Sequence, residues 1–292
     1  MARQSLDKLV IFGVGLIGGS FALAVRRTGR AKRIVGVGRS RANIEEALRR
    51  GVIDESAESM ASAVHGADLI LLALPVGQMR KVMRAIAPHL EMHTLVTDAG
   101  STKQDVVALA RECLGTHLKR FVPAHPVAGA ELSGVGAAKA DLFINKNVVV
   151  TPLAKTDKNA LRRVENLWAS CGARVSQMTP RQHDEIFAAV SHLPHLLAYA
   201  LMDEIAAKPD AAKLINYAGS GFRDFTRIAG SSPEMWRDIA LANRNILLKQ
   251  LSEYQGQLKH VAHLIRKGDG AALEKMFTRA RNARKKWLRD NR

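Results

Sequence analysis

The spacing of glycines near the amino terminus is the first chemical signature in the sequence. Gly13, Gly15 and Gly18 follow a short apolar run and precede an apolar stretch of helical period. In a strand–turn–helix unit the first glycine permits the tight turn, the second lets the backbone approach a pyrophosphate, and the third permits close helix–strand packing. The pattern, with Leu16 and Ile17 inside it, therefore predicts a dinucleotide site. The alternative is a glycine turn that serves packing alone.

The end of the second predicted strand carries positive charge where dinucleotide sites usually carry an acid. The sequence there reads Arg39, Ser40 and Arg41. A carboxylate at this place binds the ribose hydroxyls of NAD, whereas guanidiniums and a hydroxyl can bind a 2′-phosphate. NADP is therefore the preferred cofactor, with NAD possible if the arginines are only exposed helix-start residues. Pro75 follows another predicted strand, and we expect it at the same cofactor site.

Polar clusters follow two further strands and interrupt the later helices. They include Ser101, His125, and the segments 191–195 and 219–229. Ligands of open α/β sheets bind at the carboxyl ends of strands, which is where Ser101 and His125 are expected. A neutral imidazole, with a reference pKa of about 6.5, can accept a proton near working pH. Taken alone, His125 is better explained as a turn residue that binds the backbone.

The elements that must position these groups alternate between strands and helices. Strands are predicted at residues 9–12, 33–37, 68–74, 94–97, 121–124, 147–151 and 173–177, and helices at 16–25, 42–50, 77–87, 101–113 and 157–170. This order predicts an α/β fold, a Rossmann-type doubly wound parallel sheet. Beyond it only helical periodicity remains, at 180–190, 193–207, 211–217, 233–267 and a shorter helix from 269.

We therefore expect a dinucleotide-binding domain over residues 1–177 and an all-α C-terminal substrate and dimerisation domain over residues 178–292. Helical domains with long apolar faces often complete their cores by pairing with a second copy, so a homodimer is expected. No apolar signal region precedes the first strand, and the longest apolar run, residues 69–76, is too short to cross a bilayer. A cytoplasmic protein without a membrane partner is expected.

Charge and cysteine content narrow the function further. The formal charge of +17 suits small anionic ligands or nucleic acid, but no basic groove with interleaved aromatic residues is present. We therefore expect a small-molecule substrate and no nucleic-acid partner. Cys113 and Cys171 are isolated, which excludes a thiolate metal cage. We expect no metal, and a buried structural role for both cysteines.

Taken together, the motifs resemble the prephenate/arogenate (cyclohexadienyl) dehydrogenase family. The resemblance implies oxidative decarboxylation of prephenate or arogenate with hydride transfer to NADP or NAD, yielding 4-hydroxyphenylpyruvate or tyrosine in tyrosine biosynthesis. The matching segments occur in the family's order and span nearly the whole chain: residues 13–20, 98–103, 125–131, 191–195 and 221–227.

The resemblance also implies roles for single residues. His125 matches the catalytic histidine that acts on the substrate hydroxyl, and Ser101 matches a serine that hydrogen-bonds near it. The alternative for Ser101 is a helix N-cap. Arg227 matches the arginine that holds a substrate carboxylate, while Arg223 faces solvent or pairs with Asp224.

Further substrate-binding residues are expected from the same match. Ser191 and His195, one helical turn apart, share a face, whereas His192 points elsewhere and is interpreted as structural. Glu131 is either a substrate-site group or a helix-start carboxylate, and Trp236 either a pocket wall or a core residue.

Two other functions remain open at this point. Another two-domain reductase, such as a β-hydroxyacid dehydrogenase or an imine reductase, has a similar layout but usually depends on a lysine in its helical domain. A basic NADP-binding sensor that acts on nucleic acid is the alternative from a different class.

Overall fold

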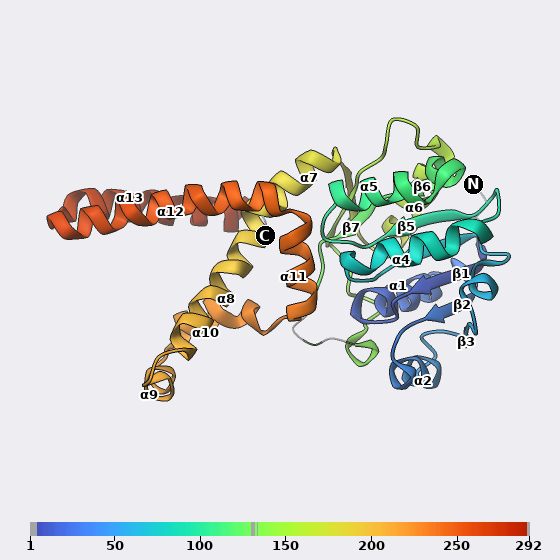
Figure 1. The fold of residues 1–292 in the computed structure, drawn as a ribbon, viewed down its shortest axis with the longest axis horizontal. Coiled ribbons are helices and arrows are strands. Elements are labelled where there is room, and N and C mark those ends of the chain that lie inside the picture. Colours follow the sequence, from blue (N-terminus) through green and yellow to red (C-terminus); the bar gives the residue numbers. More distant parts are fainter. Residues whose placement is uncertain (1–4, 130–131, 133, 291–292) are drawn as a thin grey trace. The chain divides into compact units, whose positions relative to one another are not determined.

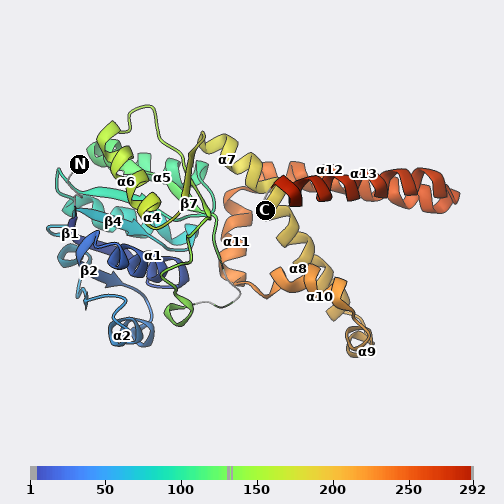
Figure 2. The ribbon, with the colours of Figure 1, turned by 180° about the vertical axis from the view of Figure 1, so that it is seen from behind.

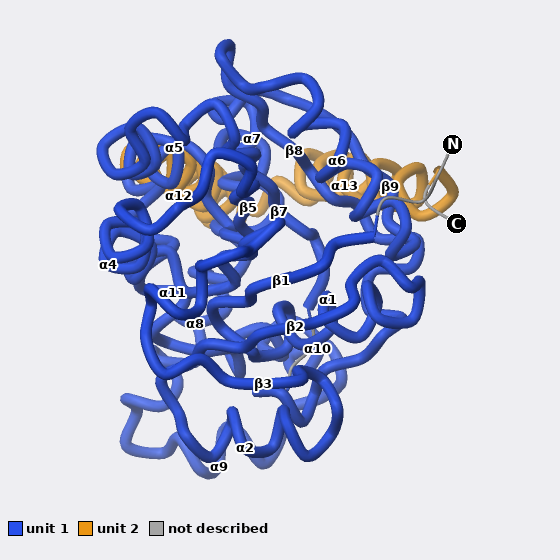
Figure 3. The backbone as a smooth tube through the Cα atoms, turned by 90° about the vertical axis from the view of Figure 1, so that its right-hand side faces the viewer, with its two compact units in different colours: residues 1–244 blue, residues 245–292 orange. Residues whose placement is uncertain are grey.

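The computed structural model describes residues 5–129, 132 and 134–290. The chain forms two compact units, residues 1–244 and residues 245–292, which Figure 3 colours separately. The first unit contains the sheets and most of the helices, which are labelled in Figure 1 and seen from behind in Figure 2.

A six-stranded parallel sheet forms the centre of the first unit, as predicted. Its strands lie in the order β3-β2-β1-β4-β5-β6, so the order changes direction between β1 and β4. Ligands of such sheets bind at this change, beyond the carboxyl ends of the strands. The strands are β1 (Leu6–Phe12), β2 (Ala31–Val37), β3 (Glu55–Ser56), β4 (Leu69–Leu72), β5 (Leu95–Asp98) and β6 (Phe121–Val122).

Helices connect these strands and cover both faces of the sheet (Figure 1). They are α1 (Leu16–Arg27), α2 (Arg41–Arg49), α3 (Met60–Val64), α4 (Val76–Ile86) and α5 (Gln104–Cys113), with short 3₁₀ turns at Ala87–His89, Gly115–Arg120 and Val135–Ala137. Successive side chains of β1 alternate between two apolar cores. Leu9 and Ile11 belong to one, and Val10 and Phe12 to the other.

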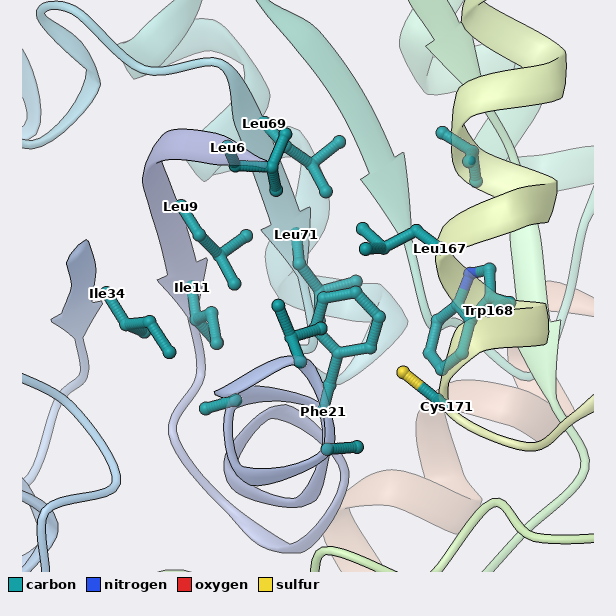
Figure 4. Close-up of a cluster of buried hydrophobic side chains, with 14 of the residues drawn as sticks. Leu6, Leu9, Ile11, Phe21, Ile34, Leu69, Leu71, Leu167, Trp168 and Cys171 are labelled. Atoms are coloured by element: carbon teal, nitrogen blue, oxygen red, sulfur yellow. The ribbon is translucent and has the colours of Figure 1, made fainter. Parts of the chain in front are cut away.

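The first of these cores joins the sheet to a later helix. Phe21 of α1 lies 4.6 Å from Trp168 of α6 (Lys158–Ser170) between ring centroids, and Figure 4 shows the two rings together beneath the strands. Cys171 is fully buried beside them, and burial raises the pKa of its thiol to about 12. Cys113 is only partly buried, so the prediction of two buried cysteines is wrong for Cys113.

A second, three-stranded sheet was not predicted. It contains β7 (Ala124–Pro126), β8 (Asn147–Val150) and β9 (Arg174–Gln177), with β7 antiparallel to β8 and β8 parallel to β9. The predicted strand at residues 121–124 is therefore wrong, because β6 ends at Val122 and β7 begins at Ala124 in the other sheet. Pro123 lies between them and has no amide to donate to a strand ladder.

The later part of the first unit is helical, as predicted. Its elements are α7 (Pro180–Phe187), a π-helical turn (Ala188–His192), α8 (Leu193–Ala206), α9 (Ala211–Asn216), α10 (Ser220–Thr226), a 3₁₀ turn (Arg227–Gly230) and α11 (Pro233–Ala242). The π turn lies just before Pro194, whose missing amide interrupts the regular hydrogen-bond pattern. Helix α10 was not predicted, because its polar and glycine residues leave no helical periodicity of apolar residues in the sequence.

The predicted helix over residues 233–267 is two helices. It breaks at Asn243, where φ −103° and ψ 24° leave the helical region. The second unit then consists of α12 (Arg244–Lys267) and α13 (Gly270–Asp290), joined at Gly268 with φ 65°. The short helix predicted from residue 269 is in fact 21 residues long, since the basic residues continue it.

The stretch Pro180–Ala206 meets the length and composition criteria for a membrane span, with a mean hydropathy of 1.2 over an 18-residue window of which 28% is buried. Long apolar helices of other proteins meet the same criteria. This stretch carries His183 and Asp184, which are buried in a polar network within the first unit. Such a network is typical of a folded interior.

Candidate active site

The glycine-rich turn after β1 leaves room for a ligand at one position and none at the others. A Cβ on Gly13, whose φ is 94°, would lie 2.2 Å from the Ala73 carbonyl oxygen, and one on Gly18 would lie 2.2 Å from the Gly13 carbonyl oxygen. A Cβ on Gly15 would meet nothing within 4 Å. Gly15 starts α1, and no side chain caps that end. The backbone there fits a pyrophosphate.

The predicted phosphate-binding residues lie together after β2, each in an interaction of its own. Arg39 forms an ion pair with Glu234 of α11 at 3.2 Å, and Arg41 pairs with Glu45 at 2.7 Å. Ser40 caps α2 by accepting a hydrogen bond from the Asn43 amide at 3.2 Å. Pro75 lies at the start of α4, beyond the end of β4.

His125 lies on β7 and is almost fully buried. Its Nδ1 lies 2.8 Å from Nε2 of His183, and Nδ1 of His183 lies 2.8 Å from Oδ1 of Asp184. Burial above all, and then the nearby His183, holds the pKa of His125 well below its ordinary value of 6.5. Burial also lowers the pKa of His183, so both rings are neutral at physiological pH.

This chain of contacts determines which nitrogen of His125 carries its proton. The Asp184 carboxylate can only accept, so His183 donates from Nδ1 and its Nε2 is the acceptor. His125 must then donate from Nδ1 to His183, which leaves the lone pair of His125 on Nε2. Asp184, His183 and His125 together therefore present a neutral imidazole with Nε2 ready to accept a proton.

Backbone amides hold Asp184, the last residue in this chain of contacts, in place. Asp184 accepts hydrogen bonds from the amides of Lys103 and Gln104, each at 2.8 Å, at the start of α5. Its own carbonyl accepts one at 3.0 Å from Nδ2 of Asn243, which also lies 3.2 Å from Nδ1 of His192. Burial lowers the pKa of His192 to about 4, which agrees with the structural role predicted for it.

A buried ion pair positions the strand that carries His125. Lys103 Nζ pairs with Asp98 at the end of β5, and it also donates to the Ala124 carbonyl at 2.9 Å. Asp98 accepts a hydrogen bond from the Ala124 amide at 3.1 Å. Both backbone groups of the residue before His125 are thus tied to the main sheet.

Roles for His183, Asp184, Asp98 and Lys103 were not predicted from the sequence. Asp98 and Lys103 lie within a recognised motif, and their charge next to a buried strand was the available signal. His183 and Asp184 gave no comparable signal, because their partners are 58 and about 80 residues away in the chain.

A second group of predicted residues lies on α8, α11 and the turn between them. His195 stacks on Trp236 with ring centroids 3.7 Å apart, and its Nδ1 lies 2.9 Å from the Ser191 carbonyl oxygen. Burial above all lowers the pKa of His195, and the positive charge of Arg227 lowers it further. Tyr199 donates to the Ser231 carbonyl at 2.6 Å, which ties the turn to α8.

These two groups meet through His192. Its ring lies 6.1 Å from that of Trp236, and its charge, when present, lowers the pKa of His125. The structure therefore places His125, Trp236 and His195 along one series of contacts within the first unit.

The remaining predicted residues have mixed outcomes. Ser101 lies between β5 and α5, but the alternative that it caps the helix is wrong, because α5 begins at Gln104 with Lys103 in the cap position. Arg223 is exposed on α10. Glu131 lies outside the described residues.

A dinucleotide-binding sheet and a buried neutral imidazole beside its carboxyl end define a nicotinamide-dependent dehydrogenase. Comparisons with known proteins give its family. The family description "prephenate dehydrogenase, nucleotide-binding domain" matches residues 21–177, and "prephenate dehydrogenase, dimerization domain" matches residues 179–279.

Similar proteins cover nearly the whole chain. A prephenate dehydrogenase of Bacillus subtilis is 38% identical over 97% of this chain and 76% of its own length, and a cyclohexadienyl dehydrogenase of Zymomonas mobilis is 34% identical over 94% of both. The crystal structure of prephenate dehydrogenase from Aquifex aeolicus with hydroxyphenyl propionate and NAD+ superposes with a TM-score of 0.90, at 37% identity over 97% of this chain and 98% of that one. The chain belongs to the prephenate dehydrogenase family, and it is an oxidoreductase.

Proposed function

We propose that this chain oxidatively decarboxylates prephenate, arogenate or both, with His125 as the group that accepts the substrate's hydroxyl proton. The family assignment gives the reaction. It therefore favours this activity over that of another two-domain reductase and over a nucleic-acid sensor. The single observation that supports the role of His125 is its chain of contacts with His183 and Asp184, which leaves Nε2 as the acceptor.

The substrate is a cyclohexadienol with a carboxylate on the ring carbon opposite the hydroxyl. A nicotinamide cofactor bound at the glycine-rich turn would supply the hydride acceptor for the carbon that carries the hydroxyl. His125 Nε2 takes the hydroxyl proton, so that this carbon becomes a carbonyl. The bond to the ring carboxylate then breaks and releases carbon dioxide, its electron pair enters the ring, and the new phenolic oxygen regains a proton from His125.

Asp184 stabilises the charge that appears during this step. Once Nε2 of His125 is protonated, the ring is a buried cation, which burial disfavours. His183 connects that cation to the Asp184 carboxylate through hydrogen bonds of 2.8 Å, so a negative charge is already in place. Such pre-positioned charge costs no reorganisation when the reaction occurs. Ser101 is proposed to hydrogen-bond near the reacting hydroxyl.

Arg227 is proposed to hold a substrate carboxylate, for which a guanidinium fork is well suited. The effect of its positive charge on the pKa of His195, which stacks on Trp236, supports this role. Trp236 Nε1 is buried and has no hydrogen-bond partner among the described residues, so it can donate to the same carboxylate. Ser191 contributes through its carbonyl, which orients His195.

We also propose NADP as the preferred cofactor, bound at Gly13, Gly15, Leu16, Ile17, Gly18 and Pro75, with Arg39, Ser40 and Arg41 on its 2′-phosphate. The room at Gly15 and the basic residues after β2 support this choice. NAD is the alternative, and it is the cofactor named with the Aquifex aeolicus enzyme.

The proposed assembly is a cytoplasmic homodimer, with cofactor binding in residues 1–177 and substrate binding and dimerisation in residues 178–292. Exposed apolar side chains of the second unit support pairing with another copy. They are Leu248, Leu258, Ile265, Phe277, Trp287 and Leu288.

The reaction is tested by steady-state assays of wild-type protein and His125→Asn with prephenate and arogenate, each with NADP and NAD. We expect turnover with at least one substrate, and a fall in kcat of about 100-fold or more in the variant, in line with the usual contribution of a general base. Cofactor affinity should not change, and His65→Asn, which alters an exposed histidine, serves as the control. Near-normal turnover in His125→Asn would remove His125 from the mechanism.

A further inference from the structure

Helix α11 brings a carboxylate to the place where the turn after β2 lacks one. Glu234 lies in the first turn of α11, and its two oxygens face Nη1 and Nη2 of Arg39 at 3.4 and 3.2 Å. Oε1 of Glu234 also accepts a hydrogen bond from Nε2 of Gln78 at 2.9 Å. The residues are 195 and 156 positions apart in the sequence, so only the fold brings them together.

The position of this carboxylate relates directly to the dinucleotide site. Arg39 follows β2, and Gln78 lies in the first turn of α4, which follows β4. Strands β2 and β4 flank β1 in the sheet, and the end of β1 carries the glycine-rich turn. Glu234 is therefore held from both sides of the strand that leads into the proposed pyrophosphate site.

Close packing between two helices fixes Glu234 in this position. Helix α11 packs beside α4, as Figures 1 and 2 both show, and a Cβ on Gly77 would lie 2.5 Å from Oδ2 of Asp238. Asp238 is one helical turn beyond Glu234, so the approach that Gly77 permits also sets the position of Glu234 at Gln78. Hydrogen bonds from Arg39 and then Gln78 lower the pKa of Glu234, which keeps its carboxylate charged.

We propose that Glu234 sets the cofactor preference by competing with the 2′-phosphate of NADP for Arg39. This inference rests on the proposed role of Arg39. A carboxylate and a phosphate use the same paired N–H groups of a guanidinium, so only one of them can occupy that edge at a time. NAD, which has hydroxyls at this position, does not require Arg39 to be released. Glu234 thus reduces the preference for NADP that the basic turn alone would give.

The test measures the affinities of NADP and NAD by isothermal titration calorimetry for wild-type protein, Glu234→Gln, Arg39→Ala and the double variant. Glutamine keeps the size of the side chain and an acceptor for Gln78. We expect Glu234→Gln to lower the Kd of NADP about three- to tenfold and to change the Kd of NAD by less than about twofold. The substitution removes an exposed ion pair with Arg39 and a negative charge that repels the 2′-phosphate of NADP. In the Arg39→Ala background the effect should shrink to less than about twofold.

Glu112→Gln is the matched control, because Glu112 also binds two neighbouring side chains and has the same side-chain exposure of 41%. An equal gain in NADP affinity in this control would show that the change in net charge alone explains the effect, and it would overturn the proposal. The proposal would also be overturned if Glu234→Gln left the affinity for NADP unchanged or lowered the affinity for both cofactors alike. A loss of affinity for NAD alone would overturn it too, because that result is expected if Glu234 binds the ribose hydroxyls of NAD. If Arg39→Ala itself left NADP binding unchanged, the phosphate role of Arg39 would fail first.

Discussion

His125 depends on residues behind it for its protonation state and its direction. The ring has two nitrogens, and the contact with His183 decides that the proton sits on Nδ1. Without that contact either tautomer could form, and a ring with its proton on Nε2 could not accept the substrate proton. The proposed catalytic role of His125 therefore depends on Asp184 and His183 as well.

A pH profile tests the protonation state of this unit. Burial holds the pKa of His125 well below 6.5, so the neutral, active form persists as the pH falls through 6.5 and is lost only further down. We expect the acidic limb of kcat/KM, which reports the free enzyme, to lie below pH 6.5. Rates measured between about pH 5 and pH 9 check this, with circular dichroism at each pH as the control for unfolding. An acidic limb centred above pH 7 would contradict a buried neutral imidazole.

At the scale of elements, a break between helices stabilises the site. The chain leaves the helical conformation at Asn243, and its side chain bonds both the Asp184 carbonyl and His192. Helix α7, the π turn and α11 are thereby connected through one buried amide.

Asn243→Ala should show what this connection contributes. The substitution leaves a buried carbonyl and a buried imidazole nitrogen without their donor, and we expect the free energy of unfolding to fall by about 1–3 kcal/mol. Urea unfolding followed by circular dichroism measures this. Asn282→Ala on α13, where the side chain is exposed, should change it by less than about 0.5 kcal/mol. Equal effects of the two substitutions would show that the amide of Asn243 is not a structural bond.

At the scale of the whole molecule, much apolar surface remains uncovered in a single chain. Only 28% of the most apolar window within Pro180–Ala206 is buried, and Ile265 and Phe277 of the second unit are 63% and 59% exposed. Proteins rarely leave such surface to water, and the family model that matches residues 179–279 is described as a dimerization domain, which supports the proposed homodimer.

The proposed dimer can be disrupted from the second unit. Ile265→Glu combined with Phe277→Glu places charges on the apolar surface, and we expect sedimentation equilibrium to show a monomer where the wild-type protein is a dimer. Lys259→Glu changes an exposed polar residue of α12 and should leave the dimer intact. A dimer that survives the double substitution would place the interface elsewhere.

Local sequence patterns were sufficient to predict the element order, the parallel sheet, the dinucleotide turn and the identity of most proposed site residues. They were sufficient because periodicity and glycine spacing are local properties, which depend on neighbours a few residues away. The positions of Gly13, Gly15 and Gly18, for example, follow from the requirements of one turn. His125 and Arg227 were found from local motifs in the same way.

The pairing of polar side chains, in contrast, could be known only from the folded chain. The contact of His125 with His183, the hydrogen bond of Lys103 to the Ala124 carbonyl, and the ion pair of Arg39 with Glu234 join segments that no local pattern relates. The second sheet likewise depends on the chain leaving one sheet for the other at Pro123. These features follow from packing across the whole first unit, because a polar side chain must find its partner wherever the fold places one.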